Sequence, residues 1–536
     1  PNSGAFSFNL PAAGAGSINN SDRDVLQSTI NNLLGRVGVI QQAFVAESDS
    51  AYASPGTLFL YLSKYNEYDL FFQDTWKLRP NLTIDYGVRW EPKLSPRSGD
   101  GDTILRPDRP IRFGETPTDQ IRFVEGKLFD DDWNNFAPSI GFAWDPFSDG
   151  KTSIRANYRL AYDRMNTFLA SSAIFPSTPG TTLGLSNNTF GPQANELGRL
   201  RFGIPALVPP ATPTQLRQPA AFSNTATATV FDPSTRFPKT NQWSVSFQRE
   251  VGYGFVFEAN YIGRKGVGLF GAYDANQVNI FASDARCPGE TFLSAFNTIR
   301  SGGATTSCLA NLLFTGNTAN NTGSASFRTT LSSQLNQGSV ASAAQVLSQR
   351  VVSGQRQITT NGFTPSFFQP FSQFTAGLNV IDSNDFSTYH GLEMQVSRRV
   401  GRGLLMQLSY TLSKSLDTRS FDPAFTVVAR TVSTANASPS GQNTPFDNRD
   451  RRLNYARSDF DRRHAFQGYF VYDLPFGRNQ RFLSDSNGLV NQIIGGWEVA
   501  SSIIFQSGRP FTVYSGAFTL SNAVLSPPNC NGSSPS

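Results

Sequence analysis

The segment YNEYDLFFQDTWKLRPNLTIDYGVRWE, residues 65–91, decides the fold class. Apolar side chains take almost every second position on both sides of the turn at 79–81, and polar ones fill the positions between. The apolar positions are Tyr68, Leu70, Phe72, Trp76 and Leu78, then Leu82, Ile84, Tyr86, Val88 and Trp90. A period of two on both arms predicts a β-hairpin. Each arm has about ten residues, the length that crosses a bilayer at a tilt.

The same pattern recurs four times along the chain. Alternating arms flank turns near 148–150, 252–254 and 401–403, and a fifth, less regular hairpin is predicted over about 464–474 and 495–507. In each case one face is almost purely aromatic and aliphatic, whereas the other mixes charged and polar side chains. These five hairpins give about ten long strands.

The links between strands alternate in length. The turns within hairpins are mostly short, but the links between hairpins are long, near 96–134, 165–239, 269–386 and 418–462. This alternation is typical of outer-membrane barrels, with short periplasmic turns and long extracellular loops. We therefore predict an all-β fold, an antiparallel transmembrane β-barrel over 63–515. Residues 1–62 should hold a partial strand and a loop with a helix near 22–45, and 516–536 a loop or truncated C-terminal end.

The composition agrees with strands joined by turns. Charged residues make up 16%, below the roughly 25% of ordinary globular chains, and the chain contains 45 Phe. No apolar run reaches the roughly 18 residues of a membrane helix. The net charge of +5 is small and dispersed, so nucleic acid is not an expected partner. A soluble sheet protein with one buried face is the alternative fold.

Few residues suggest chemistry. Two of the three cysteines, Cys287 and Cys308, fall in the long 269–386 loop, and we predict that they form a disulfide outside the cell. Two free thiols are the alternative. The chain has two histidines and no CxxC pair, so neither a metal site nor a cofactor is expected. No catalytic motif is complete, and we expect no enzyme.

Charged side chains on the polar faces are the candidates for ligand or plug contacts. They are Asp85, Arg89, Arg155, Arg159 and Glu258 on predicted strands, and Arg451, Arg452 and Arg462 in the charged stretch 448–464. The latter could form a cationic lip that attracts anionic ligands. Structural pairing across strands is the alternative for the first group, and an internally paired loop is the alternative for the second.

Several segments resemble the barrels of Oar-like TonB-dependent receptors. They include FFQDTWKLRPNLTIDYGVRWEP at 71–92, FAPSIGFAWDPFSDGKTSIRANYRLAYDR at 136–164 and STYHGLEMQVSRRVGRGLLMQLSYTLSKSLD at 387–417. The most specific are SDFDRRHAFQGYFVYDLPFG at 458–477 and GGWEVASSIIFQSGRPFTV at 495–513. The resemblance implies a barrel of about 22 strands with a plugged lumen. It also implies a plug and a TonB-contacting segment, neither of which this sequence contains, so we expect truncation at both ends.

The expected function is that of an outer-membrane TonB-dependent receptor that actively takes up, or exports, a large substrate. Its expected partners are outer-membrane lipid, the TonB complex through a plug not present in this chain, and an unknown extracellular ligand. A passive porin, or a structural or adhesive barrel acting through its long loops, is the alternative.

Overall fold

The computed structural model describes residues 19–33, 40–48, 51–58, 62–99, 104–114, 121–167, 169–170, 182–187, 207–209, 227–302, 306–375, 377–398, 403–420 and 445–522. The chain divides into two compact units. The first comprises Pro1–Leu62 with Phe175–Ala220, and the second comprises Ser63–Ile174 with Ala221–Ser536.

The described residues of the first unit include one helix and a small antiparallel sheet. Helix α1 spans Asn20–Leu33, and strands β1 (Ile40–Ser48), β2 (Ala51–Tyr52) and β11 (Thr182–Asn187) pair in the order β11-β1-β2. The helix predicted over 22–45 is therefore too long, since its second half contains a strand. The sequence between α1 and β1 carries Gly35 and Gly38 beside β-branched Val37 and Val39, which disfavour a helix and favour a strand.

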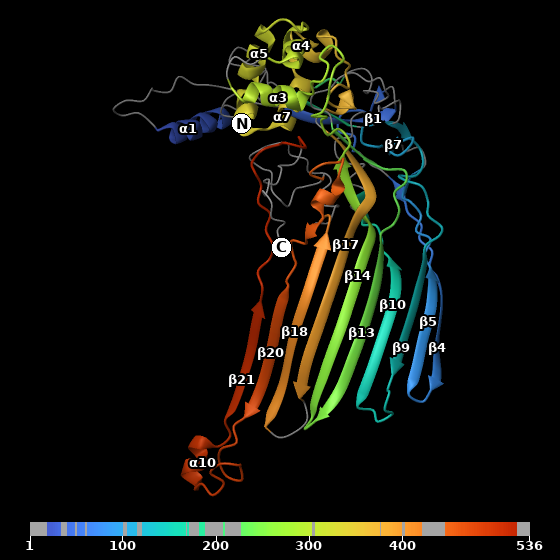
Figure 1. Cartoon of the computed structure of the whole chain (residues 1–536), viewed down its shortest axis with the longest axis vertical. Coiled ribbons are helices and arrows are strands. Elements are labelled where there is room, and N and C mark those ends of the chain that lie inside the picture. The colour runs from blue at the N-terminus through green and yellow to red at the C-terminus, as the bar shows by residue number, and fades with distance from the viewer. Residues whose placement is uncertain are drawn as a thin grey trace. The chain divides into compact units, whose positions relative to one another are not determined.

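Ten long strands of the second unit form one antiparallel ladder, here called the wall (Figure 1). Neighbours along it are β21-β20-β18-β17-β14-β13-β10-β9-β5-β4. Their bounds are β4 Leu70–Arg79, β5 Leu82–Trp90, β9 Phe136–Trp144, β10 Thr152–Tyr162, β13 Lys239–Gly252, β14 Phe255–Asp274, β17 Gly377–Arg398, β18 Leu404–Asp417, β20 His464–Asp473 and β21 Glu498–Gln506. All five predicted hairpins are confirmed, and strands consecutive along the wall pair as antiparallel neighbours.

Two strands run further than predicted. β14 continues to Asp274 and β17 begins at Gly377, so both enter the stretch expected to be loop at 269–386. Their extensions pair with each other, and β12 (Thr227–Phe231) adds to β17 in parallel. The extensions are buried on both faces, which removes the alternation that marks the rest of each strand.

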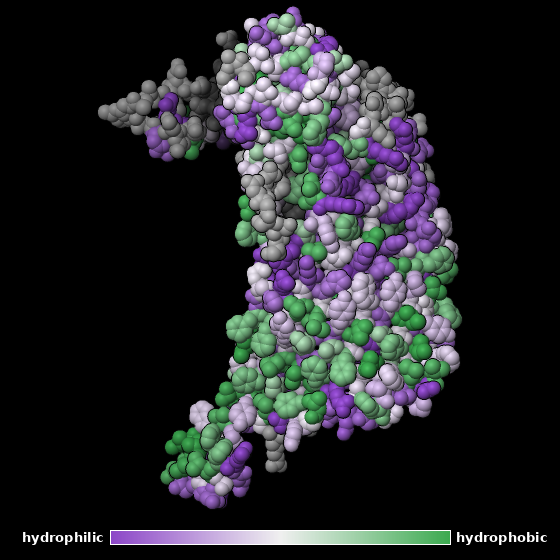
Figure 2. Space-filling view, in the orientation of Figure 1, coloured by the Kyte–Doolittle hydropathy of each residue, from purple (hydrophilic) through white to green (hydrophobic). Residues whose placement is uncertain are grey.

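The two faces of the wall differ as predicted. Large apolar side chains remain exposed on the outward face; Leu70, Phe136 and Phe505, for example, are 62%, 54% and 67% exposed. The inner face carries polar contacts between strands, such as Asn157 to Ser244 and Gln407 to Gln395. Figure 2 shows hydrophobic side chains gathered over the lower parts of the wall strands and hydrophilic ones above. An apolar band with a polar opposite face is what a membrane barrel requires.

Between β14 and β17 the chain folds into a helical module, here called the cap, residues 276–375. Its helices are α3 Phe292–Arg300, α4 Cys308–Thr315, α5 Thr322–Thr330, α6 Ser332–Gln337, α7 Val340–Gln349 and α8 Gln357–Thr360. They surround an apolar core that includes Phe292, Phe296, Phe327 and Phe368, each at most 1% exposed. A stretch expected to be loop is thus largely helical, because apolar residues at helical spacing bury one face of each helix.

A segment beyond β21 completes this core. Phe518 is 3% exposed within the cap core, and its backbone N–H donates to Ser339 Oγ over 3.2 Å. The backbone N–H of Ala341 donates in turn to the carbonyl of Phe518 over 2.9 Å. The cap is therefore built from two segments separated by the last four strands of the wall.

The remaining described elements of the second unit are short. They are β3 Ser63–Lys64, β6 Arg97–Ser98, β7 Ile104–Pro107, β8 Ile121–Val124, β15 Val351–Val352, β16 Gln355–Arg356, β19 Ala456–Arg457, the 3-10 helices η2 Ser372–Phe374 and η5 Arg451–Asn454, and helix α10 Gly488–Ile494. Helix α10 lies at the end of the wall opposite the cap (Figure 1). Within the described parts of the chain, no helix is both long enough and apolar enough to span a membrane.

Candidate functional site

The predicted lumen charges lie along the inner face of the wall and do not gather into one site. Arg159 Nη2 donates to Gln242 Oε1 over 3.1 Å, and Glu258 Oε1 accepts from Asn260 over 3.0 Å. Arg155 contacts Ser153 on its own strand, and Arg89 forms an ion pair with Glu91 at 3.3 Å. The local contacts of Asp85 are with Gly141, where an added Cβ would lie 2.6 Å from the carboxylate. Of these contacts, those of Arg159 and Asp85 reach a neighbouring strand, whereas those of Arg155, Glu258 and Arg89 stay within their own strand or at its end.

The three predicted lip arginines have separate positions. Arg462 Nη1 donates to the carbonyl of Ser507 over 2.8 Å, and Arg452 is exposed. Of the three, Arg451 lines the cavity described next. The structure therefore does not assemble the three side chains into one cationic surface.

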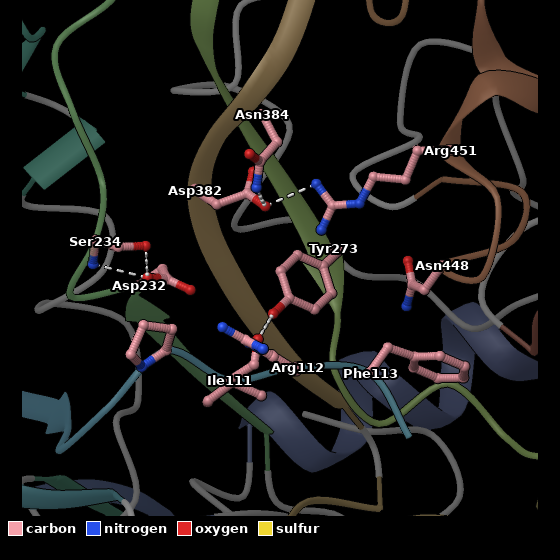
Figure 3. A pocket seen from close by; sticks show the side chains of 11 residues that line it. Ile111, Arg112, Phe113, Asp232, Ser234, Tyr273, Asp382, Asn384, Asn448 and Arg451 are labelled. Atoms are coloured by element: carbon pink, nitrogen blue, oxygen red, sulfur yellow. Dashed lines mark hydrogen bonds and ion pairs between the residues drawn. The ribbon is translucent and has the colours of Figure 1, made fainter. Parts of the chain in front are cut away.

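The cavity that contains Arg451 has a volume of about 470 Å³ and lies near the cap ends of β14 and β17 (Figure 3). Five separate stretches of sequence contribute to it. The lining residues are Pro110, Ile111, Arg112, Phe113, Asp232, Ser234, Tyr273, Asp382, Asn384, Asn448 and Arg451. Tyr273 is positioned by β14, Asp382 and Asn384 by β17, and Arg451 by the short helix η5.

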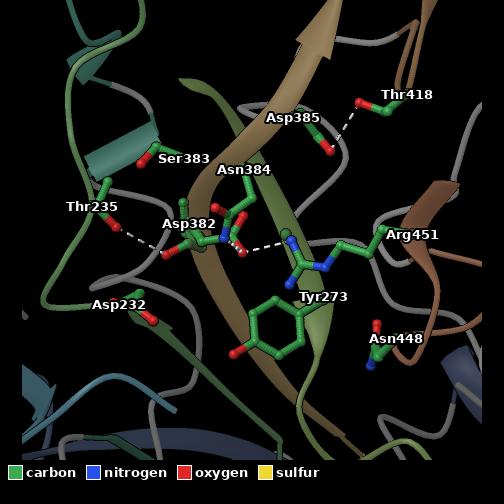
Figure 4. Close-up of polar contacts among 12 residues, drawn as sticks. Asp232, Thr235, Tyr273, Asp382, Ser383, Asn384, Asp385, Thr418, Asn448 and Arg451 are labelled. Carbon is green, nitrogen blue, oxygen red and sulfur yellow. Dashed lines mark hydrogen bonds and ion pairs between the residues drawn. The ribbon is translucent and has the colours of Figure 1, made fainter. Parts of the chain in front are cut away.

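An ion pair organises one side of the cavity. Arg451 Nη1 lies 2.7 Å from Asp382 Oδ2, and the guanidinium carbon lies 4.4 Å from the centre of the Tyr273 ring. Asn384 donates to the same carboxylate oxygen over 2.8 Å, and Figure 4 shows these groups converging. Burial lowers the pKa of Arg451, but the Asp382 carboxylate more than offsets this, so the pKa is raised. Arg451 is thus a fixed cation already committed to Asp382.

The cavity offers hydrogen-bond acceptors that the described residues leave unused. Asp382 Oδ1 and Asn448 Oδ1 are buried without a partner among them. Asp232 provides a second carboxylate, whose Oδ1 accepts from the Ser234 backbone and hydroxyl. Burial raises the pKa of Asp232, against the opposing effect of these hydrogen bonds. Because unsatisfied buried acceptors are costly, the cavity is complementary to a ligand that brings N–H or O–H donors.

Sequence reasoning found Arg451 alone among these residues. The others come from loops and strand ends far apart in the chain, so no local spacing marks them. The run Asp382-Ser383-Asn384-Asp385, polar within an otherwise regular strand pattern, is the one local signal that could have indicated them.

Cys287 and Cys308 form a disulfide in the cap, with their Cα atoms 5.7 Å apart. Glu290 lies beside them, and the three side chains together have the composition of a small metal site. The sulfur atoms are bonded to each other, however, and Glu290 Oε2 accepts from the backbone N–H of Leu309 in the first turn of α4. The cluster therefore joins two parts of the cap and does not provide thiolate ligands.

An antiparallel wall with an apolar outward face and a polar inner face is the pattern of the outer-membrane β-barrels. The family model described as outer membrane beta barrel domain matches residues 1–536, and the chain belongs to this family. This places the protein in the outer membrane of a Gram-negative-type bacterium. Receptor and transporter barrels of this kind are in general not enzymes.

Solved structures that match part of this chain include three bacterial proteins. The FrpB iron transporter from Neisseria meningitidis (F3-3 variant) is 10% identical with a TM-score of 0.29, and the match covers 78% of this chain and 32% of that one. The siderophore receptor PirA from Pseudomonas aeruginosa is 7% identical, with coverages of 76% and 34% and a TM-score of 0.26. The ferric-catecholate import receptor Fiu from K12 E. coli is 10% identical, with coverages of 82% and 38% and a TM-score of 0.27.

The chain thus spans about a third of the length of these structures. Similarity this low is not an indication of a shared ligand. No curated protein matches the chain.

Proposed function

We propose that this domain forms part of the barrel wall of an Oar-like TonB-dependent receptor, which moves a large substrate across the outer membrane. The observation that carries the proposal is the open wall. Ten strands pair in succession, yet among the described residues β4 and β21 do not pair with each other. We infer that the wall is part of a barrel of more than ten strands, and barrels of about 22 strands are the ones that hold a plug.

Energy would reach the receptor from the TonB complex through a plug, and the barrel itself would do no bond chemistry. The sequence resemblance at 458–477 and 495–513 supports this assignment. The cavity near the cap is the candidate contact for the substrate, because it lies at the loop end of the wall and presents free acceptors.

The test uses the full-length protein purified from outer membranes. We expect it to bind the purified periplasmic domain of TonB in surface plasmon resonance, with an unrelated periplasmic protein as the control. We also expect no steady conductance in planar lipid bilayers, because a plug closes the lumen. A steady pore without TonB binding would identify a passive porin, and neither signal would identify a structural or adhesive barrel.

The cavity is tested separately with two sugars of equal size and opposite charge. We expect glucosamine, an ammonium and hydroxyl donor, to bind more tightly than glucuronate in calorimetric titrations of the full-length protein. Asp232→Asn should weaken glucosamine binding about tenfold, since a hydrogen bond to a charged group contributes roughly 1.5–3 kcal/mol. Asp284→Asn, on the cap surface beside Arg286, is the matched control. Equal binding of both sugars would exclude the acceptor site.

A further inference from the structure

Three lysines lie close together on the outward face of the wall, toward its cap end. Lys239, Lys265 and Lys414 belong to β13, β14 and β18, and all three side chains are exposed. The strand register shows which face of the wall each lysine occupies. Lys239 and Lys265 continue the alternation of Trp243 and Tyr261, and Lys414 pairs with His390 on the same face.

The register places the lysines within three adjacent cross-strand rows. The rows read Tyr158–Trp243–Gly263–His390–Lys414, then Leu160–Asn241–Lys265–Thr388–Leu416, then Tyr162–Lys239–Val267–Phe386. None of these residues is acidic; the first row reaches an acid, Asp74, three strands beyond Tyr158. Among the described residues none of the three lysines takes part in an ion pair, so their charges are not neutralised by the protein.

The rows lie where the apolar band ends. From Phe255 at the short turn to Lys265, β14 runs about eleven residues, which matches the 9–11 that a tilted strand needs to cross the hydrocarbon. The residues just below the rows are apolar and exposed, such as Val245 and Leu392. Tyr261 and His390 form a hydrogen bond of 2.8 Å at this level, and Trp243 packs against the His390 ring. An aromatic girdle of this kind marks the membrane–water interface.

We propose that Lys239, Lys265 and Lys414 form a binding site for the phosphate groups of a phosphorylated glycolipid in the outer leaflet. The site faces lipid from outside the barrel and is independent of any transported substrate. Lysine suits the position, because its flexible stem lies along the apolar surface while the ammonium reaches the headgroup layer. Lysine is also rare in this chain, which contains only eight, so three of them in adjacent rows are a local concentration.

The site follows from charge complementarity across these adjacent rows. Basic residues beside an anionic lipid surface each contribute roughly a fivefold gain in binding. Three in adjacent rows, with no acidic residue among those named, therefore favour a headgroup with more than one phosphate over a zwitterionic one. Tyr162 and Trp243 flank the lysines and add the amphipathic rings that interfacial sites favour.

The test places the full-length protein in phosphatidylcholine nanodiscs containing 5 mol% lipid A, a glycolipid with two phosphates. Native mass spectrometry then counts the lipid A molecules retained after release. We expect the wild type to retain lipid A, and K239Q/K265Q/K414Q to bind it about 100-fold more weakly, from the three fivefold contributions. The control K77Q/R79Q/K151Q removes the same charge at the short-turn end and should bind like the wild type.

Three further arms separate the sources of an effect. K239R/K265R/K414R keeps the three charges and should still bind lipid A. Binding by this variant would show that the glutamine variant lost the site and did not simply misfold. Lipid A stripped of phosphate should not be retained. Equal retention of the stripped lipid, equal retention by the glutamine variant, or complete displacement by millimolar inorganic phosphate would each overturn the proposal.

Discussion

The cap and the wall use the same kinds of residue in opposite ways. In the cap, Phe292, Phe296 and Phe327 are at most 1% exposed and contact one another. In the wall, Phe72 and Phe142 are 61% and 40% exposed on the outward face. The cap buries its apolar surface against itself, as a water-soluble domain does, whereas the wall leaves its apolar surface for lipid to cover. The surroundings of each region, water for the cap and lipid for the wall, and not its composition, determine whether its aromatic rings are buried or exposed.

The largest effect that separates the two regions should come from emptying the cap core. Phe292→Ala removes a fully buried ring and leaves a cavity, at a cost of about 3–5 kcal/mol. Phe142→Ala on the wall should cost much less, because lipid chains fill the space. Hydrogen exchange of cap and wall amides in the full-length protein measures both. Equal losses would contradict the contrast between the regions.

A charge on the lipid side of the wall should have the next largest effect. Tyr86→Arg near the middle of the apolar band should cost at most about 2–4 kcal/mol, because the new guanidinium faces Asp74, the cross-strand partner of Tyr86; urea unfolding from lipid vesicles measures it. The matched control is Gln73→Arg. Gln73 lies on the neighbouring strand β4 and points to the inner face, so this change should be nearly neutral. Spin labels at 84, 86 and 88 should report lipid and labels at 85 and 87 water, and the reverse pattern would overturn the assignment of the faces.

Opening the disulfide should weaken the cap alone. The chain-entropy model gives at most about 3 kcal/mol for a loop of this size, and the packed core retains the rest of the fold. C287S/C308S should speed hydrogen exchange in the cap and leave wall amides unchanged. A non-reducing peptide map of the wild type should contain the cross-linked pair, and full alkylation of both thiols without reduction would end this prediction.

The smallest perturbation tests which side of the membrane each region faces. In a Cys530→Ser background, Asn320→Cys in the cap should react with a membrane-impermeant maleimide on intact cells. Tyr253→Cys, in the turn between β13 and β14, should not react until the outer membrane is opened. Equal labelling of both positions would refute the orientation.

The wall was predictable because a period of two is a local signal. Residues such as Ile84, Tyr86 and Val88 reveal their face without reference to any distant segment. The cap was not predicted, because its helices are short and Ser- and Ala-rich, and their apolar positions become a core only when packed together. The cavity was missed for a related reason, since Asp232, Tyr273 and Asp382 are brought together only by the pairing of β12, β14 and β17.

The insertion of Phe518 into the cap core sets an order on assembly. The cap begins in the chain before β17, yet one of its core residues is delivered only after β21 has been made. A chain in which residue 518 has not yet reached the cap therefore holds a core with an open place for one ring. The cap core is complete only when a segment that follows β21 in the chain has packed against it.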